Sequence, residues 1–137
     1  MPRIQLALNV SNINEAVTFY SNLFGSEPAK RRPGYANFAI GDPPLKLVLI
    51  EKPSQAGTLN HLGVEVERSA EVSEADRRLQ QQGLEPRAEQ QVTCCYAVQD
   101  KIWVHDPDGA AWEIYTVLDD ADTDGRSSES IESCTNC

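Results

Sequence analysis

The sequence lacks the long apolar runs and the surplus of basic residues that would suit a membrane or a nucleic acid. No apolar run approaches the roughly 20 residues that a membrane-spanning helix needs. Acidic residues outnumber basic ones by 21 to 12, so the net charge is −9. Binding to phosphates calls for a basic stripe, and the only basic cluster is KRR at residues 30–32. We therefore expect neither a nucleic-acid nor a membrane partner.

The N-terminal residues, MPRIQLALNV, also lack the layout of a secretory signal, because the apolar run is short and no small-residue cleavage site follows. We predict a cytoplasmic protein, in which the four cysteines stay reduced. Large apolar residues are almost absent from residues 119–137, which contain six acidic residues and one arginine. Such a segment cannot offset its ordering entropy, so we predict a disordered, acidic, cysteine-containing tail after a folded domain of residues 1–118.

The folded body carries a weak internal repeat. The alternating stretch IQLALNV (residues 4–10) precedes a helical pattern in residues 11–25, and NHLGVEV (residues 60–66) precedes another in residues 67–83. Strand-like runs follow each helix. The class is therefore α+β, with two modules at about residues 1–55 and 56–118 that should pair to cover their open sheets.

Three polar residues fall at equivalent places in this repeat. Gln5 and His61 lie 56 positions apart in the first strand of each half, and Glu113 lies in the last strand. An amide oxygen, an imidazole and a carboxylate suit a first-row divalent ion, and three ligands leave positions open for catalysis. Taken singly, each has a plainer interpretation: a surface amide, a hydrogen-bonded strand histidine and a rim carboxylate. Their shared position in a repeat favours the metal site.

Two adjacent cysteines, Cys94 and Cys95, raise a separate question. Neighbouring Cα atoms are only about 3.8 Å apart, shorter than a relaxed disulfide prefers, and adjacent strand side chains point to opposite faces. The pair therefore predicts a bend that grips a third atom, and the alternative is two small buried residues. In the tail, Cys134 and Cys137 form a C-x₂-C that is half a site for a soft ion. His105 precedes a DPDG turn and is expected at the surface.

The motifs IQLALNV, NHLGVEV and WEIYTV resemble the vicinal oxygen chelate superfamily, which includes glyoxalase I and extradiol dioxygenases. The resemblance implies two paired βαβββ modules that form a cup-shaped sheet around a metal, with ligands at Gln5, His61 and Glu113. Lys46 stands where a glyoxalase would have a fourth ligand, and an ammonium cannot coordinate. This departure favours a three-ligand site.

A narrower resemblance, carried by RIQLALNV, TLNHLGVEV and TCCYAVQDKIWV, is to the organoarsenical carbon–arsenic lyases of that superfamily. It covers about residues 3–118. It implies Fe(II)- and dioxygen-dependent cleavage of the C–As bond of trivalent methyl or aromatic arsenicals, with release of arsenite. Cys94 and Cys95 would bind the substrate, and another divalent metal can replace the iron in a crystal.

Two other functions remain open from the sequence. Cadmium-induced proteins share much of the pattern, so the four cysteines could sequester arsenic or cadmium without turnover. A glyoxalase-type metalloenzyme is the third interpretation. The sequence leaves open the preferred arsenical, a monomer or homodimer, and the role of the two tail cysteines.

Overall fold

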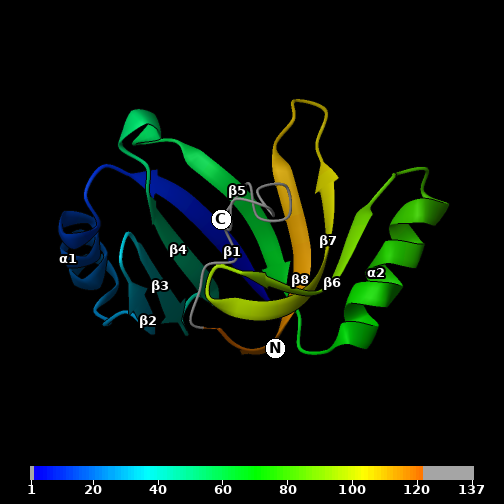
Figure 1. The fold of residues 1–137 in the computed structure, drawn as a ribbon, viewed down its shortest axis with the longest axis horizontal. Coiled ribbons are helices and arrows are strands. Elements are labelled where there is room, and N and C mark those ends of the chain that lie inside the picture. Colours follow the sequence, from blue (N-terminus) through cyan, green and yellow to red (C-terminus); the bar gives the residue numbers. More distant parts are fainter. Residues whose placement is uncertain (1, 122–137) are drawn as a thin grey trace. The chain divides into compact units, whose positions relative to one another are not determined.

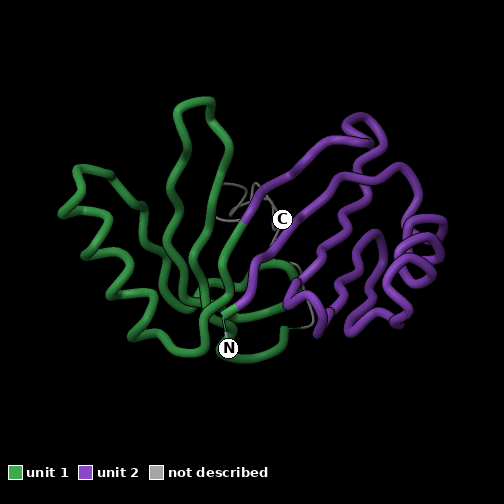
Figure 2. Tube along the Cα trace, turned by 180° about the vertical axis from the view of Figure 1, so that it is seen from behind, with its two compact units in different colours: residues 1–2, 63–137 green, residues 3–62 purple. Residues whose placement is uncertain are grey.

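The computed structural model describes residues 2–121 of the chain, which divide into two compact units (Figure 2). One unit is Arg3–Leu62, and the described part of the other is Gly63 to Ala121 together with Pro2. Each unit is a sheet with one helix packed on it (Figure 1). None of the helices in the described range is long and apolar enough to cross a bilayer.

The first unit contains strands β1 (Arg3–Val10), β2 (Lys30–Arg32), β3 (Tyr35–Ile40) and β4 (Leu45–Glu51), and helix α1 (Ile13–Phe24). A short 3₁₀ turn, η1 (Pro53–Gln55), leads into β5 (Leu59–Glu65), which crosses the boundary between the units. The strand order is β2-β3-β4-β1. β1 runs parallel to β4, whereas β2–β3 and β3–β4 are antiparallel.

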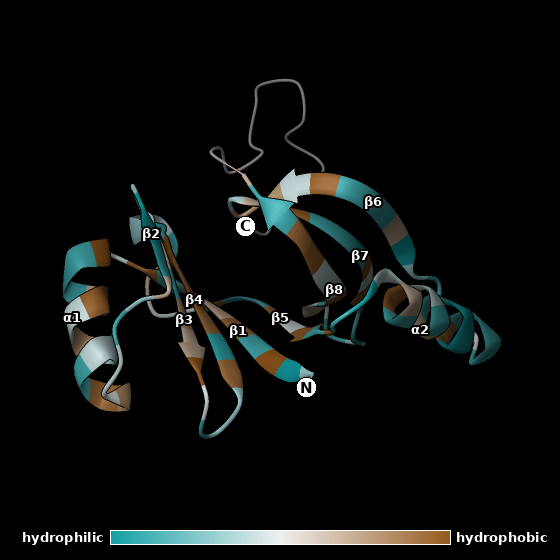
Figure 3. Cartoon of the chain, turned by 90° about the horizontal axis from the view of Figure 1, so that it is seen from below, coloured by the Kyte–Doolittle hydropathy of each residue, from teal (hydrophilic) through white to brown (hydrophobic). Residues whose placement is uncertain are grey.

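Polar and apolar residues alternate along β1, as the hydropathy bands of Figure 3 show, and successive side chains of a strand point to opposite faces. Leu6, Leu8 and Val10 pack with Ile13 and Val17 of α1 in the apolar core. The Asn12 side chain accepts a hydrogen bond from the backbone N–H of Glu15 and so caps the helix. Gly25 ends it with φ 63°, a conformation that favours glycine.

The second unit contains helix α2 (Ser69–Gln81) and strands β6 (Arg87–Cys94), β7 (Ala97–His105) and β8 (Ala111–Asp120) in the order β8-β7-β6. Both pairings are antiparallel. Val72, Ala75 and Leu79 of α2 pack with Ile102 and Ile114 on one face of this sheet. The opposite face is therefore left for polar side chains.

Both pairings in this unit contain a bulge. The β6–β7 register shifts between Glu89 and Val92, where Gln91 has φ 52°, and the β7–β8 register shifts between Val98 and Gln99. The Asp100 carboxylate accepts hydrogen bonds from the Gln91 backbone N–H and the Ser69 hydroxyl, which ties the first bulge to α2. Bulges of this kind redirect side chains next to functional sites.

The predicted α+β class and the strand–helix–strands order of both halves are confirmed. The predicted tail was placed from residue 119, but β8 continues to Asp120 because its last residues pair with Ala97 and Val98. The rest of the tail, including Cys134 and Cys137, lies outside the described residues.

Candidate functional site

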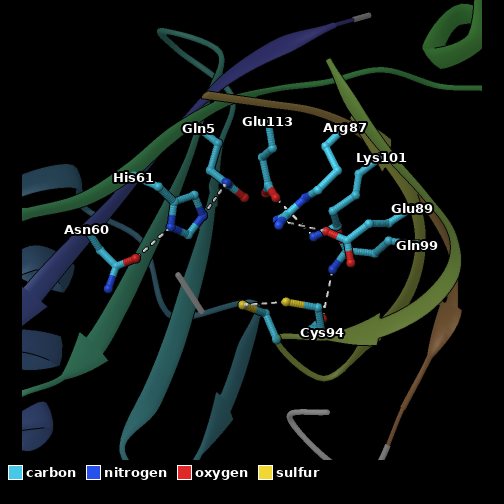
Figure 4. Close-up of polar contacts among 10 residues, drawn as sticks. Gln5, Asn60, His61, Arg87, Glu89, Cys94, Gln99, Lys101 and Glu113 are labelled. Atoms are coloured by element: carbon cyan, nitrogen blue, oxygen red, sulfur yellow. Dashed lines mark hydrogen bonds and ion pairs between the residues drawn. The ribbon is translucent and has the colours of Figure 1, made fainter. Parts of the chain in front are cut away.

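Gln5 and His61 form a buried polar pair inside the first unit. They come from β1 and β5, and their exposed fractions are only 3% and 2%. The Nε2 atoms of the two side chains are 3.2 Å apart, as Figure 4 shows. The alternative of a surface amide at Gln5 is therefore wrong. Buried polar side chains need partners, and these two side chains can satisfy each other or a bound metal ion.

His61 is oriented from its other side by a neighbouring amide. Its Nδ1 atom lies 2.8 Å from Oδ1 of Asn60 (Figure 4). In metal sites, such a contact to the second ring nitrogen fixes the ring and directs Nε2 toward the ion. The imidazole geometry therefore suits coordination through Nε2.

Glu113 and Lys101 form a buried ion pair in the second unit. Lys101 Nζ is 2.9 Å from Glu113 Oε2, with side chains 1% and 4% exposed (Figure 4). The ammonium also lies 5.4 Å from the Trp103 ring centroid and 5.9 Å from that of Tyr115. Glu113 is thus a fully buried carboxylate rather than a rim one, and the Lys101 charge stabilises it there.

The two cysteines lie at a two-residue hairpin turn between β6 and β7, one just before the turn and one inside it. Cys94 pairs with Ala97, so Cys95 and Tyr96 are the central residues, with φ 51° and 61°. Both left-handed values are typical of a type I′ turn, where asparagine and glycine are usual. The Sγ atoms are 3.9 Å apart, whereas an S–S bond is about 2.05 Å. The predicted bend is confirmed, and it brings both sulfurs to the same side.

The oxidation state of this segment differs from the expectation that all cysteines stay reduced. Cys94 is disulfide-bonded, but Cys95 is not. Disulfides persist in oxidising surroundings and are rare where the surroundings keep thiols reduced. Binding a ligand through both sulfurs therefore requires reduction of Cys94 first.

Two further contacts hold the hairpin turn in place. Gln99 Nε2 donates a 2.7 Å hydrogen bond to the Cys94 carbonyl oxygen, and the Ala121 N–H donates to the Tyr96 carbonyl oxygen at 2.9 Å. Gln99 is 3% exposed, and its buried Oε1 accepts no hydrogen bond from the described part of the chain. The turn is therefore fixed from within its own unit.

The turn should store strain that a glycine would relieve. Replacing Tyr96 with glycine is expected to raise the free energy of unfolding by about 1 kcal/mol, because a left-handed side chain costs roughly 1–2 kcal/mol. Urea denaturation measures the change. Ala97→Gly, one residue on in the strand, is the matched control and should lower stability by roughly 0.5–1 kcal/mol. Equal losses in both variants would show that the turn is not strained.

The structure divides the predicted site residues between the two units. Gln5 and His61 meet in one unit, while Glu113, Cys94 and Cys95 belong to the other. Within residues 2–121, no three His, Cys, Asp or Glu side chains cluster as ion ligands, and the predicted set contains only two residues of these types. His105 is exposed, as expected.

Sequence reasoning missed the residues whose side chains contact the predicted site residues. Lys101 and Gln99 were not assigned a role, although their alternation with Trp103 along β7 places all three on one face. Asn60 was also missed. Its position directly before His61 gave no signal, because the contact depends on side-chain rotamers.

The chain matches a known protein family along most of its length. Residues 4–114 match the family described as the Glyoxalase/Bleomycin resistance protein/Dioxygenase superfamily. This chain belongs to that superfamily. A Mycobacterium tuberculosis protein named Cadmium-induced protein CadI is 60% identical over 125 residues, covering 91% of this chain and 82% of the relative. A Thermomonospora curvata protein named Trivalent organoarsenical cleaving enzyme is 56% identical over 131 residues, covering 95% and 87%. The predicted resemblance to organoarsenical carbon–arsenic lyases is confirmed.

Solved structures of this superfamily share the fold. The 2,3-dioxygenase LapB from Pseudomonas sp. KL28 aligns with a TM-score of 0.63 and 22% identity, over 93% of this chain and 43% of that one. The Mn(II)-bound glyoxalase from Novosphingobium aromaticivorans aligns with a TM-score of 0.61 and 16% identity, over 98% and 45%. At these identities the likeness concerns the fold alone.

Proposed function

We propose that this protein cleaves the carbon–arsenic bond of trivalent organoarsenicals, such as methylarsenite and aromatic arsenicals, in an Fe(II)- and dioxygen-dependent reaction that releases arsenite. The observation that carries the proposal is the hairpin turn that sets the Cys94 and Cys95 sulfurs 3.9 Å apart. Trivalent arsenic is soft and thiophilic, and soft thiolates select soft centres. The 56% identity to a named organoarsenical cleaving enzyme supports the same activity.

The hairpin turn with Cys94 and Cys95 would bind the substrate by ligand exchange. Each reduced cysteine replaces one hydroxyl of a trivalent arsenical, so two As–S bonds form, two As–O bonds break and two water molecules leave. The carbon substituent stays on arsenic. Because both sulfurs lie on one rigid turn, the second exchange is intramolecular and gains effective concentration. The carbon is thereby held in one orientation for cleavage.

The donor set fits a divalent iron. In the proposed site Gln5, His61 and Glu113 would hold the ion, and Fe(II) supplies the activation of dioxygen that this chemistry needs. An imidazole, an amide oxygen and one carboxylate leave a divalent ion with net positive charge. Burial of Gln5, His61 and Glu113 at 3% exposure or less keeps bulk water away from these donors. Lys101, bonded to Glu113 Oε2, keeps that carboxylate in place.

A glyoxalase-type function is disfavoured by Lys46. It is paired with Gln5 in the parallel β1–β4 register, and its ammonium cannot coordinate a metal. Sequestration of arsenic or cadmium through the thiols remains the second candidate, favoured by the 60% identity to a protein named as cadmium-induced. The reducing cytoplasm is the proposed compartment, since it would keep Cys94 and Cys95 available. Either a monomer or a homodimer is compatible with the proposal.

One experiment separates cleavage from sequestration. Protein reduced with a phosphine is loaded with Fe(II) and incubated with methylarsenite in air and under argon, and inorganic arsenite is then quantified by chromatography. Release of arsenite in air but not under argon is the expected result. Stoichiometric binding without release in either atmosphere would favour sequestration. His61→Ala should bind methylarsenite like the wild type and release no arsenite, because it removes only the imidazole.

A further inference from the structure

A chain of four hydrogen bonds leads from a surface loop to the buried imidazole of His61. Thr58 Oγ1 donates to the Gln55 carbonyl oxygen at 2.6 Å, and Asn9 Nδ2 donates to Thr58 Oγ1 at 2.9 Å. Asn60 Nδ2 donates to Asn9 Oδ1 at 2.9 Å, and Asn60 Oδ1 lies 2.8 Å from His61 Nδ1. All five residues belong to the Arg3–Leu62 unit. We call this chain the amide relay.

The direction of the amide relay is set at its outer end. A backbone carbonyl can only accept, so the Thr58 hydroxyl must use its single proton on Gln55. Thr58 Oγ1 is then left to accept, which turns the NH₂ group of Asn9 toward it. Asn9 therefore presents its oxygen to Asn60. Each amide orientation follows from the one before it, because an amide has one accepting and one donating end.

The inner end of the amide relay decides the tautomer of His61. Asn60 has its NH₂ group on Asn9, so its oxygen faces the ring and requires a proton on Nδ1. The lone pair of the neutral ring is then on Nε2, the nitrogen that lies 3.2 Å from the Gln5 amide. A divalent cation would use that same lone pair.

We propose that Asn60, Asn9 and Thr58 are positioning residues that lock His61 in the Nδ1–H tautomer and so present Nε2 for metal binding. The metal part of this inference rests on the proposed function, whereas the tautomer does not. Loop and strand are also tied by the backbone, through the bonds from Asn9 N to Thr58 O and from Gly57 N to Asn9 O. A cavity of about 360 Å³, lined in part by Asn9 and Thr58, lies beside the outer end of the relay. Thr58 is exposed, so the relay can be cut at its origin without touching the ring.

The test uses nitrogen-15 NMR of the metal-free full-length protein. The long-range correlation pattern of the His61 ring is expected to show the Nδ1–H tautomer in the wild type. Asn60→Leu should give a mixture of tautomers and weaken Fe(II) binding, measured under argon by competition with a chromophoric chelator, by about 10–100-fold. Thr58→Val should change the tautomer ratio and the Fe(II) affinity in the same direction by a smaller amount. Thr58→Ser keeps the hydroxyl and should leave both at their wild-type values.

Thr18→Val is the matched control, because the Thr18 hydroxyl also donates to a backbone carbonyl, that of Asn14, on an exposed helix face. It should leave tautomer and affinity unchanged. An Nε2–H tautomer in the wild type, or unchanged tautomer and Fe(II) affinity in Asn60→Leu, would overturn the inference. Failure of the lyase proposal would instead appear as a wild type that releases no arsenite in air, with the tautomer result intact.

Discussion

Replacing Lys101 with methionine is expected to lower the free energy of unfolding by about 3–5 kcal/mol. Removing one member of a buried ion pair leaves the other charge buried without a counter-charge, which is strongly destabilising. Here the carboxylate is that of Glu113, and the pair is 2.9 Å apart with both side chains nearly inaccessible. Methionine keeps most of the aliphatic stem, so packing changes little. Urea unfolding followed by tryptophan fluorescence measures the loss, because Trp103 lies beside the ion pair.

Two further variants test whether charge is the cause. The double variant Lys101→Met/Glu113→Leu removes both charges and should recover most of the loss, since buried pairs are often replaceable by apolar groups. Arg77→Met on the exposed face of α2 is the matched control and should change stability by less than about 0.5 kcal/mol. A single Lys101 variant as stable as this control would contradict the buried ion pair.

Replacing Cys95 with serine is expected to weaken binding of methylarsenite by about 10²–10⁴-fold, because the second sulfur contributes through effective concentration. All proteins are compared in a Cys134→Ser/Cys137→Ser background after reduction with a phosphine, so the only remaining sulfurs of cysteine are those of the turn. Equilibrium dialysis with arsenic quantification gives the affinity. Cys94→Ser should lose a similar amount.

Fe(II) binding supplies the complementary measurement for this prediction. The cysteine variants should bind Fe(II) like their parent, whereas Glu113→Gln should bind it more weakly and keep methylarsenite affinity. Retention of tight methylarsenite binding in Cys95→Ser would rule out a two-sulfur site. Loss of Fe(II) binding in the same variant would mean that the cysteines hold the metal instead.

Local patterns in the sequence predicted the faces of the elements well. The alternation in IQLALNV puts every second residue on the same face, and Leu6, Leu8 and Val10 do pack together against α1. The repeat placed Gln5 and His61 at matching positions, and their side chains meet. These predictions succeed because the period of a strand is fixed by backbone geometry.

Contacts that depend on strand register could not be predicted in the same way. The partner of Glu113 is Lys101, on the neighbouring strand, and the diagonal between them follows from the register that pairs Lys101 with Tyr115 and Trp103 with Glu113. The bulge at Gln91 could not be predicted, because its residue with positive φ is not a glycine. The Cys94–Cys95 bend was predicted from disulfide geometry. The type of turn was not predicted, because Cys95 and Tyr96 take left-handed conformations in which asparagine and glycine are usual. Such departures are expected where a site imposes its own demands.

The brevity of the hairpin turn limits how this protein can evolve or be engineered toward bulkier ligands. Cys95 and Tyr96 are the whole connection, so inserting or deleting a single residue would shift one strand against the other. Because β7 is also held by its pairing with β8, a shift of one position would exchange the faces of the β6 residues. Exchanging side chains around the turn therefore disturbs the sheet less than changing the length of the connection.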